Sequence, residues 1–459
     1  MGEHPLPADP DGKLPALRGV EVLPFRRGAD VYFALRDPLQ LADSIVVSGA
    51  GCFILAHLDG EHSCADIARA FRRRAGLELP QREIRQLVQA LDEALLLHGP
   101  RFERALAERR AAYAAAPVRD NRDRYPAAAA LRATLRRIIA RGAATPPRTL
   151  RGLIAPHLDY ERGAPCYAAA YAALSAFINA RMAGNSRPVR FVLLGTNHGG
   201  LSSSVVLTTK DFLTPLGRAT TDRAFIDRIA QRLRGKHRRS AQRLRGENGR
   251  SAQRLRGENG PSADPARNGH PAPGGATAVE LCADEIDHFG EHSVELQLHF
   301  IQVLMEDRPF QIVPVLCPDV CGPNGTAARD GRGPDLADFA DALGALIAAD
   351  RSHRTIVIAG ADLSHVGQRF GDANPTTPAF LEQVAASDRA LLDLLGARRE
   401  EDFRRQVRDA ENATRICSTG CIYALLRALP GRPCRVLAYH QAVDHPAETY
   451  VACAAALVS

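Results

Sequence analysis

Two short apolar runs that each end in a histidine constrain the fold of this chain more than any other feature. They occupy residues 152–157 (GLIAPH) and 191–198 (FVLLGTNH), and the Ala- and Tyr-rich segment 164–183 between them has the length of a helix. This order predicts a βαβ unit with parallel strands, which places both histidines at the same edge of one sheet. We therefore expect His157 and His198 to form half of a metal site.

The remainder of the second half alternates strand-like and helical patterns. Strands are predicted at 204–209, 311–316, 355–360, 435–439 and 450–457, and helices from 222 and at 335–349, 380–395 and 422–429. This alternation predicts an α/β fold over 148–459, with a mixed, mostly parallel sheet and helices on both faces. An eleven-residue repeat that starts at Ala230, Ala241 and Ala252 leads into a Pro- and Gly-rich stretch. We interpret 236–276 as a disordered surface insert.

The first hundred residues have a different organisation. A strand-like run at 44–48 precedes helical patterns at 51–58, 63–75 and 81–97, and Ser63 and Asp66 have the spacing of a capping box. We predict a small α+β, winged-helix-like module at 1–100, followed by an Arg- and Ala-rich helical connector at 101–147. The module resembles the PqqD-like peptide-recognition modules that accompany radical SAM enzymes. That resemblance implies a radical SAM enzyme or a peptide as partner, whereas a plain packing domain is the alternative.

Composition excludes several classes of function. The formal charge of +7 and the pI near 9.0 come from arginines spread over helical stretches, so no nucleic-acid partner is expected. The ten cysteines contain no CxxC pair, which argues against structural zinc and a disulfide framework. No apolar run has the length of a membrane span, and the N-terminus is polar. We expect a cytoplasmic protein that does not associate with membranes.

Further chemically active side chains fall at the ends of predicted elements. Asp362 and His365 follow the strand 355–360, and His292 and Glu295 open a helix. Cys417 lies just before a helix start, where the helix dipole lowers the pKa of a thiol and favours the metal-binding thiolate. Taken singly, each of these residues has a structural explanation. However, His157, His198, Asp362 and His365 all lie at ends of predicted strands, which favours one shared site.

Five ordered motifs resemble those of the MEMO family, which includes the bacterial AmmeMemoRadiSam system protein B. They are Ala155-Pro156-His157, Gly195-Thr196-Asn197-His198, Glu291-His292-Ser293-Val294-Glu295, the segment 362–370 (DLSHVGQRF) and Ile416-Cys417. The resemblance covers 148–459 apart from the insert and implies a fold similar to class III, extradiol-type dioxygenases. Asp159 and Gly199 depart from the family pattern, because a small residue and a second histidine are common there.

By resemblance, His157, His198 and Cys417 are the metal ligands, and His365, Asp362 and His292 are catalytic groups that line the same pocket. Extradiol enzymes use two histidines and a carboxylate on Fe(II), so Glu295 or Asp362 are alternatives for the third ligand. The expected cofactor is a divalent transition metal, Fe(II) by resemblance, while a thiolate ligand favours copper or zinc.

Two functions follow from these expectations. The first is a redox or dioxygenase-like reaction on a small molecule bound in the α/β pocket, in association with a radical SAM system. The alternative is a non-catalytic adaptor that binds a peptide or a partner protein and retains a vestigial dioxygenase pocket.

Overall fold

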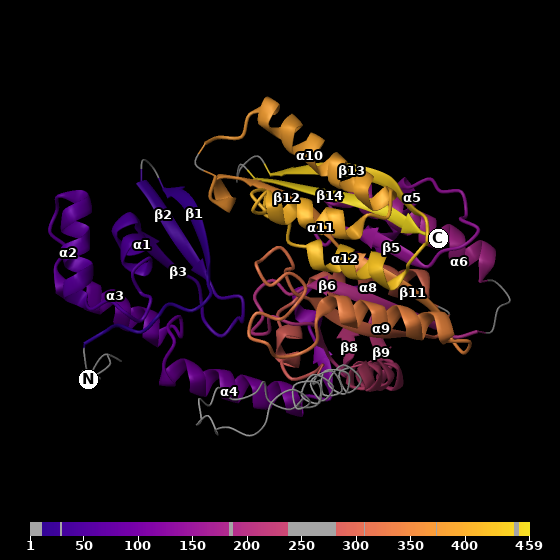
Figure 1. Ribbon diagram of the computed structural model, residues 1–459, viewed down its shortest axis with the longest axis horizontal. Helices are drawn as coiled ribbons and strands as arrows, with labels where there is room; N and C mark the ends of the chain where they lie inside the picture. Colours follow the sequence, from indigo (N-terminus) through magenta and orange to yellow (C-terminus); the bar gives the residue numbers. More distant parts are fainter. Residues whose placement is uncertain are drawn as a thin grey trace, which may run out of the picture.

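The structure is a computed structural model that describes residues 12–27, 30–182, 187–236, 281–306, 308–372, 374–444 and 449–459. The predicted insert at 236–276 lies outside these ranges except for Lys236. Two lobes are visible in Figure 1, a small N-terminal one and a large one built around a long sheet.

Parallel strands form the centre of the large sheet and carry the candidate site at their carboxyl ends. In spatial order they are β5 (Gly152–Ala155), β11 (Arg354–Gly360), β6 (Val189–Thr196), β10 (Phe310–Cys317) and β9 (Gly217–Thr221). Residues in β5 and β6 are buried throughout, as expected for strands covered on both faces. The predicted βαβ unit is present, although β11 lies between its two strands.

Antiparallel strands extend this centre on both sides. On one side β14 (Thr449–Val458) pairs with β5, with β12 (Asp362–Gly367) and with β13 (Cys434–Asp444). On the other side β8 (Asp211–Thr214) forms a hairpin with β9, and β7 (Val206–Leu207) pairs with β10. The sheet is therefore mixed, as predicted, with its parallel strands in the middle.

Helices cover both faces, and alternate strand residues enter the two cores. Val192 and Leu194 join one core, and Phe191 and Leu193 join the other. The first core is covered by α9 (Leu336–Ala349), α10 (Pro378–Gly396), α11 (Glu400–Asp409), α12 (Thr419–Ala428) and the helix over residues 223–236. The second is covered by α5 (Ala128–Arg141), α6 (Ala164–Arg181) and α8 (Ser293–Leu304).

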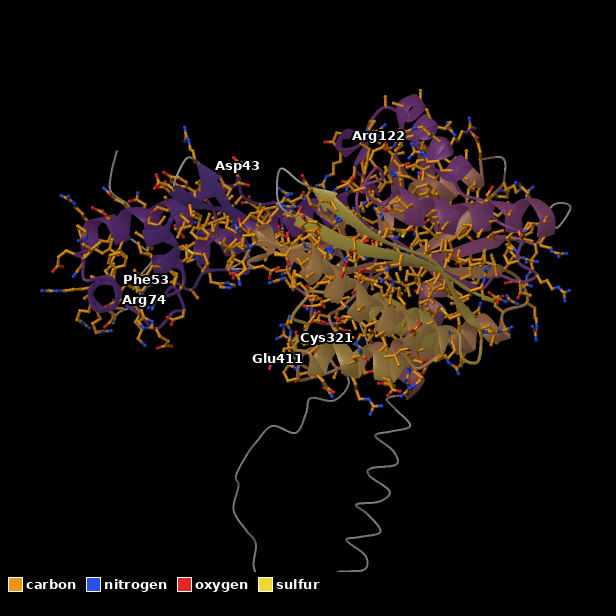
Figure 2. The ribbon with its side chains drawn as sticks, turned by 90° about the horizontal axis from the view of Figure 1, so that it is seen from above. Asp43, Phe53, Arg74, Arg122, Cys321 and Glu411 are labelled. Carbon is orange, nitrogen blue, oxygen red and sulfur yellow. The ribbon has the colours of Figure 1, made fainter. Side chains whose placement is uncertain are left out.

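The N-terminal lobe is a small α+β unit with its own core. A three-stranded antiparallel sheet, β1 (Glu21–Arg27), β2 (Asp30–Arg36) and β3 (Ile45–Ser48), precedes α1 (Gly49–Leu55), α2 (Cys64–Ala75) and α3 (Gln81–Glu93). Its core includes Leu35, Ile67 and Leu91, all fully buried. The capping box of Ser63 and Asp66 is present at the start of α2. In Figure 2, Phe53 and Arg74 lie in this lobe, well apart from Arg122 in the large lobe.

Residues 101–147 do more than connect the lobes. Between α4 (Pro100–Ala115) and α5 the chain forms β4 (Val118–Asp120), which pairs in parallel with β8 and ends the large sheet, and a short 3-10 turn η1 (Arg122–Arg124). The predicted helical character of 101–147 is present in α4 and α5, but one arginine between them, Arg119, is only 2% exposed. The buried carboxylate of Glu295 compensates the charge of this arginine.

Sequence patterns missed several short or edge elements, among them β1, β4, β8, β9, β12 and α11, together with the 3-10 turns η2 (Glu285–His288) and η3 (Gln368–Phe370). Few residues and partial burial leave little periodicity in such segments. Among the helices described, none combines the length and apolarity needed to cross a membrane.

Candidate metal centre

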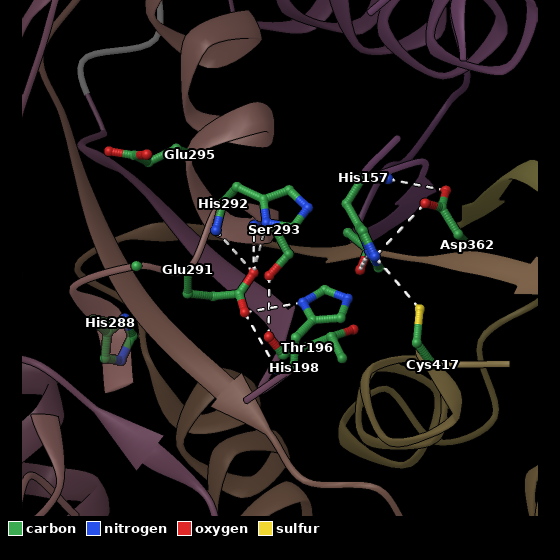
Figure 3. Close-up of polar contacts among 12 residues, drawn as sticks. His157, Thr196, His198, His288, Glu291, His292, Ser293, Glu295, Asp362 and Cys417 are labelled. Atoms are coloured by element: carbon green, nitrogen blue, oxygen red, sulfur yellow. Dashed lines mark hydrogen bonds and ion pairs between the residues drawn. The ribbon is translucent and has the colours of Figure 1, made fainter. Parts of the chain in front are cut away.

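Three imidazoles meet at the carboxyl edge of the parallel strands. His157 follows β5, His198 follows β6, and His292 caps the start of α8, which begins beside the end of β6. One ring nitrogen from each lies within 4.8 Å of the other two. The rings of His157 and His198 are 4.9 Å apart between centroids, and those of His198 and His292 are stacked at 5.1 Å. The predicted approach of His157 and His198 is confirmed, and His292 joins them (Figure 3).

Cys417 lies beside this cluster at the start of α12. Its Sγ is 3.4 Å from Nε2 of His157 and 3.4 Å from the Ser418 hydroxyl. Burial raises the pKa of the thiol, but the charge of His157 and hydrogen bonds from His157 and His198 outweigh it and hold the pKa of Cys417 well below its usual range. The sulfur is therefore a thiolate, which is the form that binds metals.

Asp362 positions the buried His157. Its Oδ1 accepts a hydrogen bond from the His157 backbone N–H at 3.1 Å, and its Oδ2 lies 3.6 Å from Nε2 of the same residue. The Nδ1 of His157 is 3.0 Å from the Gly360 carbonyl, which fixes the ring orientation so that Nε2 points to the cluster. Burial lowers the pKa of His157, but Asp362 and the Cys417 thiolate outweigh it and raise that pKa to about 10.

Glu291 positions the other two histidines. Its Oε2 is 2.9 Å from Nδ1 of His198, and its Oε1 accepts hydrogen bonds of 2.8 Å from the backbone N–H groups of His292 and Ser293. Burial raises the pKa of Glu291, yet these partners outweigh burial and lower it well below its usual range. The sequence motif contained Glu291, but no role was predicted for it. Its place directly before His292, at a helix start, was the available signal.

The protonation states of the histidines differ. Desolvation lowers the pKa of His292 to about 4, although the nearby Glu291 carboxylate acts in the opposite direction. This ring is therefore neutral. For His198 burial also lowers the pKa, but Glu291 outweighs it and the pKa is raised well above 6.5. Both side chains remain accessible, with 28% of His198 and 47% of His292 exposed. Solvent therefore reaches the cluster from their side, whereas His157 forms its buried floor.

His365 was expected at a strand end but lies within β12, opposite Val451 of β14. The missed strand β12 explains this difference. The Nδ1 of His365 is 2.8 Å from the Leu363 carbonyl, and its ring meets Phe370 edge to face. Its charge influences the pKa of both Asp362 and Cys417. His365 is thus a neighbour of the cluster and is not among the three grouped imidazoles.

Glu295, an alternative third ligand, does not face the cluster. Its side chain forms a buried ion pair with Arg119 and accepts a hydrogen bond of 2.8 Å from the Tyr125 hydroxyl. Figure 3 shows it turned away from the imidazoles. Glu295 as the third ligand is therefore wrong. This residue lies in the first turn of α8, and its side chain points to Arg119 of β4 instead of the sheet edge.

Comparison with known proteins decides the family. The sequence profile of the family described as Memo-like protein matches residues 123–243 and 277–458, which is more than half of the chain and includes His157, His198, His292 and Cys417. The chain belongs to the Memo-like family. The mixed α/β sheet agrees with the extradiol dioxygenase-like fold that the resemblance implied.

Relatives extend the similarity beyond this family profile. A MEMO1 family protein of Aquifex aeolicus is 22% identical over 386 residues, covering 84% of this chain and 83% of its own length. One of Thermus thermophilus is 25% identical over 380 residues, covering 82% of this chain and 92% of its own. Another, of Methanopyrus kandleri, is 26% identical over 245 residues, covering 53% of this chain and 63% of the relative. The two longer matches include sequence before residue 123, so similarity reaches the N-terminal region.

Proposed function

We propose that this Memo-like protein binds one divalent transition metal, with iron, copper and zinc as the candidates, among His157, His198, His292 and Cys417. The observation that carries this proposal is the convergence of three imidazole nitrogens within 4.8 Å, with a thiolate sulfur 3.4 Å from one of them. Imidazole and thiolate donors suit these three metals and disfavour magnesium and calcium.

Two of the four donors already have the protonation state that a metal needs, whereas His157 and His198, whose pKa values are raised, would release a proton on binding. His292 is neutral and Cys417 is a thiolate, so neither must lose a proton to become a ligand. Asp362 and Glu291 would act as the carboxylates that orient His157 and His198, a common arrangement around metal-binding histidines. When bound, the metal would supply Lewis acidity and, for iron or copper, electron transfer to a small substrate.

We propose a redox or dioxygenase-like reaction as the activity, in association with a radical SAM system. His365 and Asp362 are the predicted proton-transfer residues, and the accessible His292 would serve on the solvent side if it is not a ligand. Support comes from family membership and from the opening of the site between His198 and His292.

Metal content tests the proposal directly. The protein is purified anaerobically, loaded with Co²⁺, and analysed for bound metal and for a thiolate-to-cobalt absorption band. We expect about one ion per chain, loss of binding in His157→Ala and His198→Ala, and loss of the band alone in Cys417→Ser. His353→Ala, outside the cluster, is the matched control. Absence of metal from the wild-type protein, or equal metal content in His157→Ala, contradicts the proposal.

The N-terminal sheet supports the second candidate, a binding or adaptor role towards a peptide or a radical SAM partner. Phe25 is 40% exposed, Val46 is 54% exposed, and the Phe25 ring stacks on Tyr32 of the neighbouring strand. Exposed apolar side chains on a small sheet favour a protein contact. A Val46→Asp variant of the full chain should lose the partner in a pull-down with the candidate enzyme and keep its metal. A purely catalytic role predicts that this variant behaves as wild type.

A further inference from the structure

The N-terminal lobe sits directly on the mouth of the histidine cluster. A Cβ atom added to Gly199, the residue after His198, would lie 1.9 Å from the Cβ of Pro38. A Cβ on Gly290 would approach the Gln40 amide to 3.1 Å and the Pro38 carbonyl to 3.4 Å. The segment around Pro38 and Gln40 therefore packs directly against the backbone at Gly199 and Gly290. The departure of Gly199 from the family pattern therefore has a physical reason, since no histidine fits beneath Pro38.

The segment 37–42, here called the cover loop, is held in a single shape. The buried Asp37 carboxylate accepts hydrogen bonds from the backbone N–H groups of Leu39, Leu41 and Ala42, at 3.1, 2.8 and 3.1 Å. It also pairs with the buried guanidinium of Arg18 at 3.1 Å. These hydrogen bonds and this ion pair fix the conformation of the cover loop, so that it forms a rigid wall over the histidine cluster.

A cavity of about 110 Å³ lies between the cover loop and the cluster. The N-terminal half contributes the cover loop, Arg36 of β2 and Arg109 of α4 to its lining, and the large lobe contributes His198, His292 and Asp287. Its volume is below the roughly 300–1,000 Å³ of typical drug-sized sites. Only a small molecule fits between this wall and the two imidazoles.

Three acidic groups line the cavity, Glu21, Asp287 and Glu291. Glu21 is engaged by an ion pair with Arg36, and the other two are engaged by hydrogen-bond donors. Glu291 bonds to His198 and to two backbone N–H groups, and Asp287 accepts from the Asn197 amide at 2.9 Å and from the Leu201 N–H at 2.9 Å. The basic groups are less committed. Arg36 has one ion pair, with Glu21 at 3.4 Å. Arg109 lies over the Phe289 ring at 4.6 Å and has no hydrogen-bond acceptor among the described residues.

We propose that this cavity binds a small oxyanion, a carboxylate or phosphate group, and that Arg109 is its specificity-determining residue. The face of Phe289 holds the guanidinium in place and leaves its N–H donors for the ligand. The cover loop limits the ligand to a few non-hydrogen atoms beyond the anionic group. The inference rests on the proposed function in one respect, since the ligand would share the site with the metal. The contacts between Arg109 and the oxyanion do not require the metal.

Ligand-observed NMR titration of the full-length protein, with and without Zn²⁺, tests this assignment. The probes are acetate, inorganic phosphate and acetamide, the neutral isostere of acetate. Arg109→Gln removes the proposed charge, and Arg104→Gln is the matched control, because Arg104 lies on the same helix outside the cavity lining. Zinc content is measured separately for each variant.

We expect an oxyanion to bind at least tenfold more tightly than acetamide, and Arg109→Gln to weaken it at least tenfold while zinc content stays unchanged. The arm that binds more tightly, acetate or phosphate, identifies the class. Trimming the wall with Leu39→Ala and Gln40→Gly should admit benzoate, which the wild-type protein excludes. Equal binding by Arg109→Gln and wild type, equal loss in Arg104→Gln, or no oxyanion binding in either metal state overturns the inference. If the protein takes up no zinc but still binds the oxyanion through Arg109, only the metal proposal fails.

Discussion

Cys417 Sγ lies 3.4 Å from Nε2 of His157, which makes this cysteine a thiolate stabilised by an imidazolium in the metal-free protein. An ordinary thiol loses reactivity as the pH falls, because its thiolate fraction drops about tenfold per pH unit below a pKa of about 8.5. The pKa of Cys417 is held well below that range. We predict that its alkylation by iodoacetamide changes less than about threefold between pH 8 and pH 6.

Mass spectrometry of the alkylated peptides measures this rate for each cysteine. Cys321 is the internal control, because burial raises its pKa to about 12 and its alkylation should be slow and steeply dependent on pH. In His157→Ala the pH dependence of Cys417 should become that of an ordinary thiol, and bound metal should protect the wild-type residue. A tenfold decrease per pH unit at Cys417 in the wild-type protein would show that the thiolate is not stabilised.

The buried ion pair of Arg119 and Glu295 should be a main determinant of stability in the large lobe. Both side chains are 1% exposed, and Glu295 also binds the Tyr125 hydroxyl. Glu295→Gln leaves a buried guanidinium without its counter-charge, which costs about 3–5 kcal/mol. We expect denaturant-induced unfolding to show this decrease in the free energy of unfolding.

An exposed ion pair provides the comparison. Arg427 and Asp341 are 30% and 43% exposed and lie 2.8 Å apart, so Asp341→Asn should cost less than about 1 kcal/mol. If the two substitutions have equal effects on stability, burial of the Arg119 pair is not what makes it important.

Asp388 should make stability fall between pH 4 and pH 6. Its buried carboxyl accepts hydrogen bonds from Ser364 at 2.7 Å and Tyr439 at 2.9 Å, but burial dominates and raises its pKa to about 6. In this window the folded protein binds a proton that the unfolded chain has released, so the free energy of unfolding decreases as the pH rises. The full difference is about 3 kcal/mol.

Asp388→Asn cannot titrate and should remove this contribution to the slope. The measurement is the free energy of unfolding at several pH values from 4 to 6.5, compared with wild type. Other groups contribute equally to both proteins, so the difference between the curves isolates Asp388. Parallel curves would mean that the folded and unfolded pKa values of this carboxyl are alike.

Gly199→Leu should detach the cover loop from the large lobe, because the new side chain occupies the position of Pro38. Hydrogen exchange of the backbone amides in 37–42 reports this detachment, and we expect exchange at least tenfold faster than in wild type. Gly322→Leu is the control, because a Cβ there meets nothing within 4 Å. Adding Pro38→Gly should restore part of the protection. Unchanged exchange in Gly199→Leu would argue that the loop is not seated on this glycine.

The sequence by itself determined the main architecture and the approach of two histidines. The runs before His157 and His198 are buried strands joined by a helix, and parallel strands must present their carboxyl ends at one edge. Each of these patterns lies within one stretch of consecutive residues, so it can be recognised from the sequence. The order of the motifs also predicted the family to which the chain belongs.

Only the tertiary structure decided which polar groups face one another. The direction of the Glu295 side chain depends on β4, a three-residue strand with no periodic signal, whose Arg119 takes that carboxylate away from the cluster. Likewise, β12 places His365 within a strand, and Glu291 is recognisable as the partner of His198 only in space. The seat of Pro38 on Gly199 joins segments about 160 residues apart in the printed sequence. Such contacts leave no local pattern, because the free energy that selects them comes from packing and charge compensation between distant parts of the chain.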